Sequence, residues 1–401
     1  MNPRLADAIA LFTLVSVLAL LLAPAVRLRD GWRATVTPLA SIIGSGFLVV
    51  GPILSDVAGR WASGAMLGLC VLAWLFGSAV RFNILHAEPL IANGGQHPQL
   101  QRIDRFSGLC LALAYFISVA YYLNLLGAFL LKGAGVVDPV LARGVTTAIL
   151  LALAALGWRR GFRGVERVEI YAVSFKLAVI AGVLAALGAV WLADPAARHL
   201  PPQHVTPGWR ELRTLLGCVI LVQGFETSRF LGRSYPAALR VRSMRWAQLL
   251  STAIYVAFIA LLLPHVPLGH AGAAIEETEI IDIVGHLADL LGLLLVAAAV
   301  ASQLSAAIAD MSGAGGLLNE LASWMSPRWA YVAVAAVAIG LTWSVDLFGI
   351  IAIASRAFAV YYALQCGVAS RLARERPLRS ALYALGAALA LVVVLFGLPV
   401  S

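Results

Sequence analysis

The chain has 401 residues, of which 61% are hydrophobic and 12% are charged, and its formal net charge is +9. So apolar a composition excludes a soluble domain, because a single core cannot hide that much apolar surface from water. The basic residues lie in short loops between apolar segments and form no basic face, which argues against a nucleic-acid partner. The composition therefore predicts a polytopic protein of the lipid bilayer.

Cysteine and histidine are placed without the spacing of a metal site. The four cysteines stand singly in or beside apolar segments, and the seven histidines are scattered through loops and helix ends. We therefore predict no metal, no cofactor and no disulfide framework. The sequence also has no Ser/His/Asp set or carboxylate pair at matching membrane depth, so we do not expect an enzyme.

Twelve segments are long and apolar enough to span the hydrocarbon core as helices. In chain order they cover about 7–26, 35–56, 63–84, 107–131, 142–158, 168–192, 212–232, 246–264, 286–309, 329–344, 347–369 and 380–398.

The first segment has two interpretations. It ends near Ala23-Pro24-Ala25, which imitates the cleavage site of a signal peptide. Cleavage and export would leave Arg27, Arg29 and Arg33 on the outer face, contrary to the other loops. We therefore favour a retained extra helix, although cleavage stays an alternative.

Arginine is distributed unevenly between the loops. If the loop at 27–34 is cytoplasmic, nineteen arginines fall on the cytoplasmic side, against seven basic residues outside, where the loop at 265–285 is acidic. Positive charge marks cytoplasmic loops. The pattern predicts an integral protein of the bacterial inner (plasma) membrane with both termini outside.

The chain divides into two similar blocks of five spans, and tandem blocks with an odd number of spans must have opposite topology. Each block opens on an interrupted helix, at Gly44-Ser45-Gly46 and at Gly224-Phe225-Glu226. Such internal symmetry is typical of an inverted-repeat transporter. The predicted organisation is an extra helix in 1–34, the first repeat in 35–192, an external linker in 193–211, the second repeat in 212–369 and a last helix in 370–401.

Residues 42–54 read Ile-Ile-Gly-Ser-Gly-Phe-Leu-Val-Val-Gly-Pro-Ile-Leu, an apolar segment broken by three glycines and a proline. In lipid, such a break is tolerated only where protein or a cavity satisfies the freed backbone groups. A half-helix that begins here directs its N–H groups and positive dipole end at an anion, so a substrate carboxylate would fit. The alternative is that the glycines only allow close helix packing.

Four motifs along the chain carry a family resemblance: Ile43-Gly44-Ser45-Gly46-Phe47 with Pro52, His86-Ala87-Glu88-Pro89 with Gly94-Gly95, Ser174-Phe175-Lys176-Leu177, and Gly224-Phe225-Glu226. Together they resemble the amino acid-polyamine-organocation (APC) superfamily over about 35–370. The resemblance implies an all-α polytopic membrane protein with the LeuT-like five-plus-five inverted repeat, one extra helix before the core and one after it. It also implies a secondary transporter, commonly of amino acids or amines.

The resemblance places substrate contacts at both breaks, where family members use exposed carbonyls at the second break for the substrate amine. Two polar residues on the third core helix are further candidates for the cavity lining. With Arg356, discussed below, the candidate substrate-binding residues are Ile43, Gly44, Ser45, Gly46, Phe47, Tyr121, Asn124, Gly224, Phe225, Glu226 and Arg356.

Lys176 is a lone charge inside an apolar helix, where an ammonium group cannot stay unpaired. In the family that the chain resembles, this lysine reaches the first broken helix and takes the place that sodium holds in sodium-coupled relatives. It would then couple transport to protons, or serve as a permanently charged tether to carbonyls of that helix. Ser302 and Ser305 leave a sodium site open, but we expect protons rather than sodium.

Two arginines also fall within spans. Arg356 stands about 15 Å of helical rise from Asp346, so we expect it to face the interior and to pair with Glu226 or contact an anionic substrate. Arg229 either belongs to the central site or snorkels to the cytoplasmic surface. With Lys176 they outnumber the one predicted central acid, which favours a substrate that bears a carboxylate.

The sequence therefore predicts a proton-coupled or exchange-type secondary transporter of an amino acid or related small organic solute, working by alternating access around two broken helices. One alternative is a carrier of a small carboxylate or other organic anion. Another is a sensor on the same fold, which would bind its ligand without moving it.

Overall fold

The computed structural model describes residues 3–44, 46–92, 97–160, 165–193, 195, 208–266, 278–286, 289–321 and 326–400. Ser45 and the pair Gly94-Gly95, which the sequence singles out, lie outside these ranges. The described residues form helices and no strand, so the expected all-α class is confirmed.

The first half of the chain holds the elements α1 (Pro3–Leu22), α2 (Pro24–Arg27), α3 (Asp30–Ile42), α4 (Gly46–Ala58), η1 (Gly59–Trp61), α5 (Ala62–Ala92), α6 (Pro98–Gly133), α7 (Pro139–Arg160) and α8 (Val165–Ala193). The second half holds α9 (Trp209–Gly217), η3 (Val219–Val222), η4 (Phe225–Arg233), α10 (Ala237–Leu262), η5 (Leu263–His265), α11 (Glu279–Gly285), α12 (Asp289–Leu321), α13 (Pro327–Ser344), α14 (Leu347–Leu372) and α15 (Pro377–Phe396).

Within the described ranges, nine helices are long and apolar enough to cross a membrane, and Arg328–Ser344 is a shorter apolar helix. The two segments with internal glycines, 35–56 and 212–232, are split into shorter helical pieces. The count of twelve spans and the domain boundaries stay predictions.

Several helices are longer than predicted. The predicted ranges 63–84 and 107–131 become Ala62–Ala92 and Pro98–Gly133. An apolar window finds only the part of a helix that matches the hydrocarbon core, whereas a helix can continue through polar residues beyond it. The same effect lengthens the predicted 286–309, because α12 runs to Leu321.

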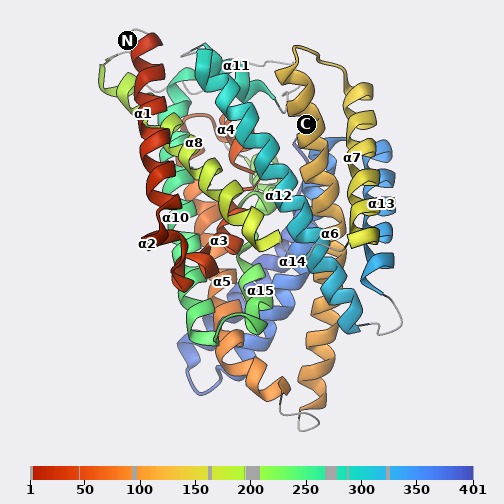
Figure 1. Cartoon of the computed structure of the whole chain (residues 1–401). Coiled ribbons are helices and arrows are strands. Elements are labelled where there is room, and N and C mark those ends of the chain that lie inside the picture. The colour runs from red at the N-terminus through yellow and green to blue at the C-terminus, as the bar shows by residue number, and fades with distance from the viewer. Residues whose placement is uncertain are drawn as a thin grey trace.

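Helix α6 is a long continuous helix that runs the height of the bundle beside α7 and α13 (Figure 1). It packs against α12 and α14, and α7 and α13 pair on one flank beside it. The broken segments α3–α4 and η3–η4 lie inside this frame, where α3 contacts η4, α8 and α10. The interrupted helices are therefore enclosed by continuous ones, as unpaired backbone in a membrane requires.

The extra N-terminal helix packs on the core. Helix α1 contacts α8, and its residues Ala6, Ala10 and Leu14 are buried there. Gly182 of α8 allows the close approach, because a Cβ atom at this position would lie 2.7 Å from the carbonyl oxygen of Ala10. Small residues at such contacts let membrane helices pack backbone to backbone.

Gly182→Ala should separate α1 from α8 and destabilise the protein by about 1–3 kcal/mol, because the new methyl group meets backbone and not a flexible side chain. Thermal unfolding of the purified protein in detergent measures the effect. Gly188→Ala is the matched control on the same helix, since no atom lies within 4 Å of its Cβ position. Equal melting temperatures for the two variants would contradict the packing argument.

Candidate functional site

The first break separates α3 from α4. Helix α3 ends at Ile42, Ile43 leaves helical geometry with φ −85° and ψ 43°, and α4 begins at Gly46. The carbonyl groups at the end of a helix lose their N–H partners. Side chains from two other helices supply replacements: Lys176 Nζ donates to Ala40 O at 3.0 Å, and Ser302 Oγ lies 3.2 Å from Gly44 O.

Lys176 thus reaches the first broken helix, and the hydroxyl group of Ser302 also lies 3.4 Å from Ile43 O. Both side chains are buried. Ser305, the other candidate for ion coupling, is half-buried, and its Oγ has no hydrogen-bond partner in the structure. Their predicted roles in coupling stay predictions.

The second break lies between η3 and η4. Gly224 has φ +115°, a left-handed conformation that favours glycine. Its N–H donates to Glu226 Oε2 at 3.0 Å, and its carbonyl accepts from Thr227 Oγ1 at 2.7 Å. Beyond the break the chain continues as a 3₁₀ helix, so the second segment is irregular over a longer stretch than its single Gly-Phe-Glu motif indicates.

The two breaks touch each other, and each contact is made at a glycine. A Cβ atom on Gly46 would lie 2.6 Å from Leu221 O, and one on Gly224 would lie 2.6 Å from the carbonyl carbon of Ser41. Tyr255 of α10 joins the same two segments, because its Oη lies 2.8 Å from both Ile42 O and Leu221 O. Glycine therefore lets the two interrupted backbones meet.

Glu226 points into the core from the second break and is fully buried. Its Oε2 accepts a hydrogen bond from Tyr362 Oη at 2.8 Å, whereas Oε1 has no hydrogen-bond partner in the part of the chain that the structure describes. Phe225 stacks on the Tyr362 ring with centroids 5.1 Å apart. A half-satisfied buried carboxyl group is costly unless a proton, a cation or a ligand completes it.

Asp310 of α12 is a second buried acid, which the sequence analysis missed. Ser118 Oγ of α6 donates to Asp310 Oδ2, whereas none of the described residues forms a hydrogen bond with Oδ1. The predicted span ended at residue 309, which left Asp310 in a loop. One signal in the sequence could have placed it in the helix: Asp310 follows the polar residue Gln303 by seven residues, or about two helical turns, so both lie on the same face of α12.

Arg356 lies elsewhere than predicted. Its Nη2 and Nε donate to the carbonyl oxygen of Gly397, at 2.5 and 3.2 Å, so it ties α14 to the C-terminal segment and forms no pair with Glu226. That segment folds back onto α9, where Leu398 N donates to Arg213 O at 2.9 Å. Sequence periodicity places Arg356 on a helix but cannot show that the chain end returns to meet it.

The side chains of the two substrate-binding candidates on α6, Tyr121 and Asn124, contact different parts of the protein. Tyr121 is fully buried beside Tyr122, with ring centroids 5.5 Å apart. Asn124 Nδ2 donates to Thr342 Oγ1 of α13 at 2.8 Å, so its amide is engaged at a helix contact. The structure therefore brings Ile43, Gly44 and Gly46 of the first break next to the second break, which carries Glu226. Asn124 and Arg356 bind other parts of the frame.

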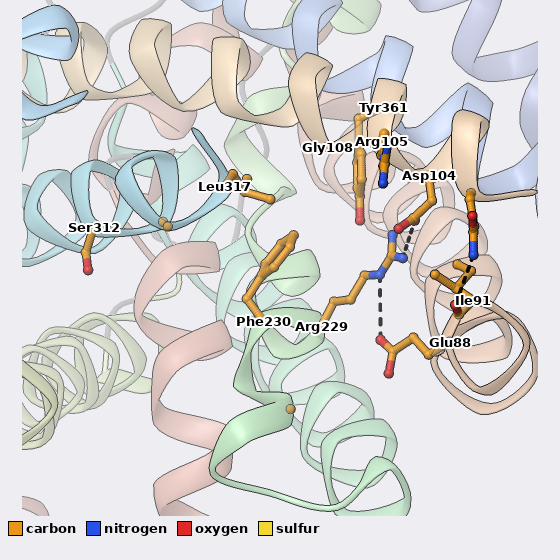
Figure 2. A pocket seen from close by; sticks show the side chains of 14 residues that line it. Glu88, Ile91, Asp104, Arg105, Gly108, Arg229, Phe230, Ser312, Leu317 and Tyr361 are labelled. Atoms are coloured by element: carbon orange, nitrogen blue, oxygen red, sulfur yellow. Dashed lines mark hydrogen bonds and ion pairs between the residues drawn. The ribbon is translucent and has the colours of Figure 1, made fainter. Parts of the chain in front are cut away.

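A vestibule of about 750 Å³ lies at the end of the bundle where α5 ends and α6 begins, with Glu88 and Asp104 in its wall (Figure 2). Ser312, Gly313 and Leu317 of α12 line it, together with Phe230 of η4 and Tyr361 of α14. In the orientation that the arginines predict, this end is cytoplasmic.

Arg229 lies in the vestibule wall between two acids (Figure 2). It forms ion pairs with Asp104 and, at 3.6 Å, with Glu88. Arg240 of α10 binds the same Glu88 carboxylate with both Nη atoms, at 3.1 and 2.7 Å, and donates to Arg229 O at 2.8 Å. The network ties η4 to α5, α6 and α10, so Arg229 neutralises peripheral acids and does not join the central site.

Tyr255→Phe should lower stability by about 1–3 kcal/mol, because it removes the one hydroxyl donor that lies 2.8 Å from two buried carbonyl groups, Ile42 O and Leu221 O. The melting temperature of the purified protein measures it. Ser344→Ala serves as the control, since this exposed hydroxyl bonds within its own helix, to Gly340 O. A melting temperature unchanged by Tyr255→Phe would show that the hydroxyl does not hold the breaks together.

Ser312→Cys should react with a membrane-impermeant maleimide in inside-out vesicles and stay unlabelled in intact cells, because Ser312 lines the vestibule. Val137→Cys, in the exposed loop at the other end, should show the opposite pattern. Both variants carry Cys110→Ala, which removes the native cysteine that is not fully buried. The reverse labelling would overturn the predicted orientation.

Three comparisons with known proteins bear on this geometry. A family model described as "APC superfamily transporter" matches residues 24–397. An uncharacterized protein of Aquifex aeolicus is 39% identical over 401 aligned residues, which cover 98% of this chain and 97% of that protein.

Two kinds of solved transporter share the fold. A mutant of the Eremococcus coleocola manganese transporter has a TM-score of 0.54 at 16% identity, covering 92% of this chain and 87% of its own. A Na⁺-coupled sialic acid symporter has a TM-score of 0.53 at 13% identity, covering 99% and 98%. The LeuT-like fold is thus confirmed, and fold and family point to a carrier and not an enzyme. The chain is an integral membrane protein and belongs to the APC superfamily of transporters.

Proposed function

We propose that this protein is a secondary active transporter that moves an amino acid or a closely related amine-bearing solute by alternating access. One observation carries the proposal: two interrupted helices meet near buried polar atoms that have no hydrogen-bond partner among the described residues, namely Gln223 Oε1, Glu226 Oε1 and Asp310 Oδ1. Such atoms are costly to bury, so a transported ligand or ion is expected to bind them.

The two breaks suit the two ends of a zwitterion. Helix α4 begins at Gly46, so the N–H groups of its first turn lack helical acceptors and suit a carboxylate. Glu226 at the second break offers an unpartnered carboxyl oxygen to an ammonium group. We infer that the substrate bridges the first turn of α4 and the carboxyl group of Glu226.

The alternative that the substrate is an organic anion is no longer supported by the observation on which it was based. It rested on an excess of positive charge at the centre, but Arg356 binds Gly397 O and Arg229 pairs with Glu88 and Asp104. The buried acids at the centre favour a substrate with a positive group. Gly51 and the buried Ile280 pack the end of the bundle opposite the vestibule, so we interpret the conformation as inward-facing.

For ion coupling we favour protons over sodium. Lys176 Nζ already places a positive group at the first break, where it donates to Ala40 O. A second cation close to it would be repelled. The hydroxyl group of Ser302 beside Ile43 O and Gly44 O supports the sodium alternative, and an exchanger needs neither ion.

The proposal predicts that a set of amino acids, amines and carboxylates, tested singly, raises the melting temperature of the purified protein only when an amine is present, because binding to the folded state stabilises it. The best ligand is then tested for uptake into proteoliposomes. Ligand-induced stabilisation without uptake would identify a sensor, and stabilisation by carboxylates alone would favour the anion alternative.

Glu226→Gln should abolish this uptake, because the amide removes the negative charge that pairs with the ammonium group. Glu375→Gln, at an exposed turn between α14 and α15, is the control and should transport normally. Uptake at the wild-type rate by Glu226→Gln would exclude the proposed role of Glu226.

A further inference from the structure

We propose that residues 396–400, which we call the strap, hold α9 in its present position and must release it before the end of the bundle opposite the vestibule can open. The inference goes beyond the proposed function and rests on it only for the existence of two conformations. Its test measures those conformations directly and needs no transported solute.

The strap begins where α15 ends and lies along α9. Gly397, directly after α15, leaves helical geometry with φ −57° and ψ 131°. Arg213 of α9 binds the strap twice, because its Nε donates to Phe396 O at 3.0 Å and its backbone carbonyl accepts from Leu398 N at 2.9 Å. The Trp209 ring of α9 packs edge-on against the Phe396 ring, with centroids 5.8 Å apart. Backbone and side chains of α9 thus both bind the strap.

Glycine lets the two backbones touch. A Cβ atom on Gly217, the last residue of α9, would lie 1.9 Å from Leu398 O, and one on Gly397 would lie 3.2 Å from Gly217 N. Gly397 and Val400 are buried in this contact region. No side chain fits at residue 217 while the strap stays in place.

Helix α14 binds the strap from another direction. Nε and Nη2 of Arg356 both donate to Gly397 O, at 3.2 and 2.5 Å. The neighbouring Ser355 accepts a hydrogen bond from the N–H of Ile220 in η3, the piece that follows α9, at 2.9 Å. Adjacent residues of one continuous helix therefore hold both the strap and the inner end of the α9–η3 segment, and the strap ties α9 to α14.

The two guanidinium groups serve this attachment. Neither Arg213 nor Arg356 forms an ion pair in the part of the chain that the structure describes. Each instead donates to a backbone carbonyl of the strap. A guanidinium group is costly within a membrane protein unless its donors are satisfied, and hydrogen bonds from charged donors are stronger than neutral ones. Two arginines from different helices therefore converge on one short non-helical segment.

Helix α9 is the part of the second interrupted segment that lies before its break, and it contacts α4, the part of the first that lies after its break. Alternating access moves such elements against each other. Because the strap is bound to both α9 and α14, α9 cannot move away from α14 without losing hydrogen bonds on one side of the strap. The strap therefore favours the conformation in which α9 stays packed against α4.

A strap that sets a conformational balance differs measurably from a simple structural anchor. Loss of an anchor loosens the whole protein, so buried residues at both ends become more accessible. Loss of the strap shifts the balance between two folded conformations, so one end opens while the other does not. Accessibility must therefore be measured at both ends.

The test is the rate of maleimide labelling of single introduced cysteines in the full-length protein in nanodiscs. Ile53 is fully buried and lies seven residues after Gly46 on the same face of α4, so Ile53→Cys reports on the end opposite the vestibule. Ser312→Cys reports on the vestibule. Both carry Cys110→Ala, and protein without the introduced cysteine gives the background from the native cysteines.

Arg356→Met keeps a long apolar side chain but removes both donors to Gly397 O. It should raise the labelling rate of Ile53→Cys about fivefold or more, because losing a hydrogen bond from a charged donor shifts a two-state balance by at least that factor. The labelling rate of Ser312→Cys should stay equal or fall. Arg371→Met, at an exposed position in the last turn of the same helix, is the control and should change neither rate.

Gly217→Ala disrupts the strap from the side of α9, because the new methyl group meets the backbone of Leu398, and it should change both rates in the same directions. Gly367→Ala is its control, since no atom lies within 4 Å of that Cβ position. Faster labelling at both ends, an unchanged rate at Ile53→Cys, or failure of both strap variants to fold would overturn the proposal. None of these results bears on which solute is carried.

Discussion

The structure depends on a contact between two interrupted backbones. Gly46 lies against Leu221 and Gly224 lies against Ser41, at distances that leave no room for a side chain. Neither break would be stable alone in a bilayer, because each exposes carbonyl and N–H groups that lipid cannot bind. Crossing them at glycines encloses both in protein and brings the freed groups of both to one place.

The freed carbonyl groups explain why polar side chains recur on the surrounding helices. Lys176 of α8, Tyr255 of α10 and Ser302 of α12 each reach a carbonyl oxygen at the first break. These contacts are the ones that must change if α3 and α4 tilt during alternating access. The frame helices are therefore coupled to the breaks through single hydrogen bonds, each of modest net worth, about 1 kcal/mol, which suits a structure that must rearrange.

The sequence predicted the features whose causes are local. Glycine and proline in 42–54 place the first break because they interrupt a helix wherever they occur, and Lys176 was expected at that break from its motif. Features that depend on partners far away in the sequence were not predicted. Sequence periodicity does not reveal that the chain folds back to bring Gly397 to Arg356. It also does not reveal the hydrogen bond between Ser118 and Asp310.

Charge placement separates two tasks in this fold. At the vestibule, Arg229 and Arg240 meet Glu88 and Asp104, so opposite charges hold helix ends together where water lowers the cost of ionisation. At the centre, Glu226 and Asp310 meet only hydroxyl and amide groups in the contacts described. An acid that is paired permanently with a cation contributes to structure and cannot respond to a ligand. A buried acid without a paired cation can bind a positively charged group. A transporter can bind such a group in one conformation and release it in another.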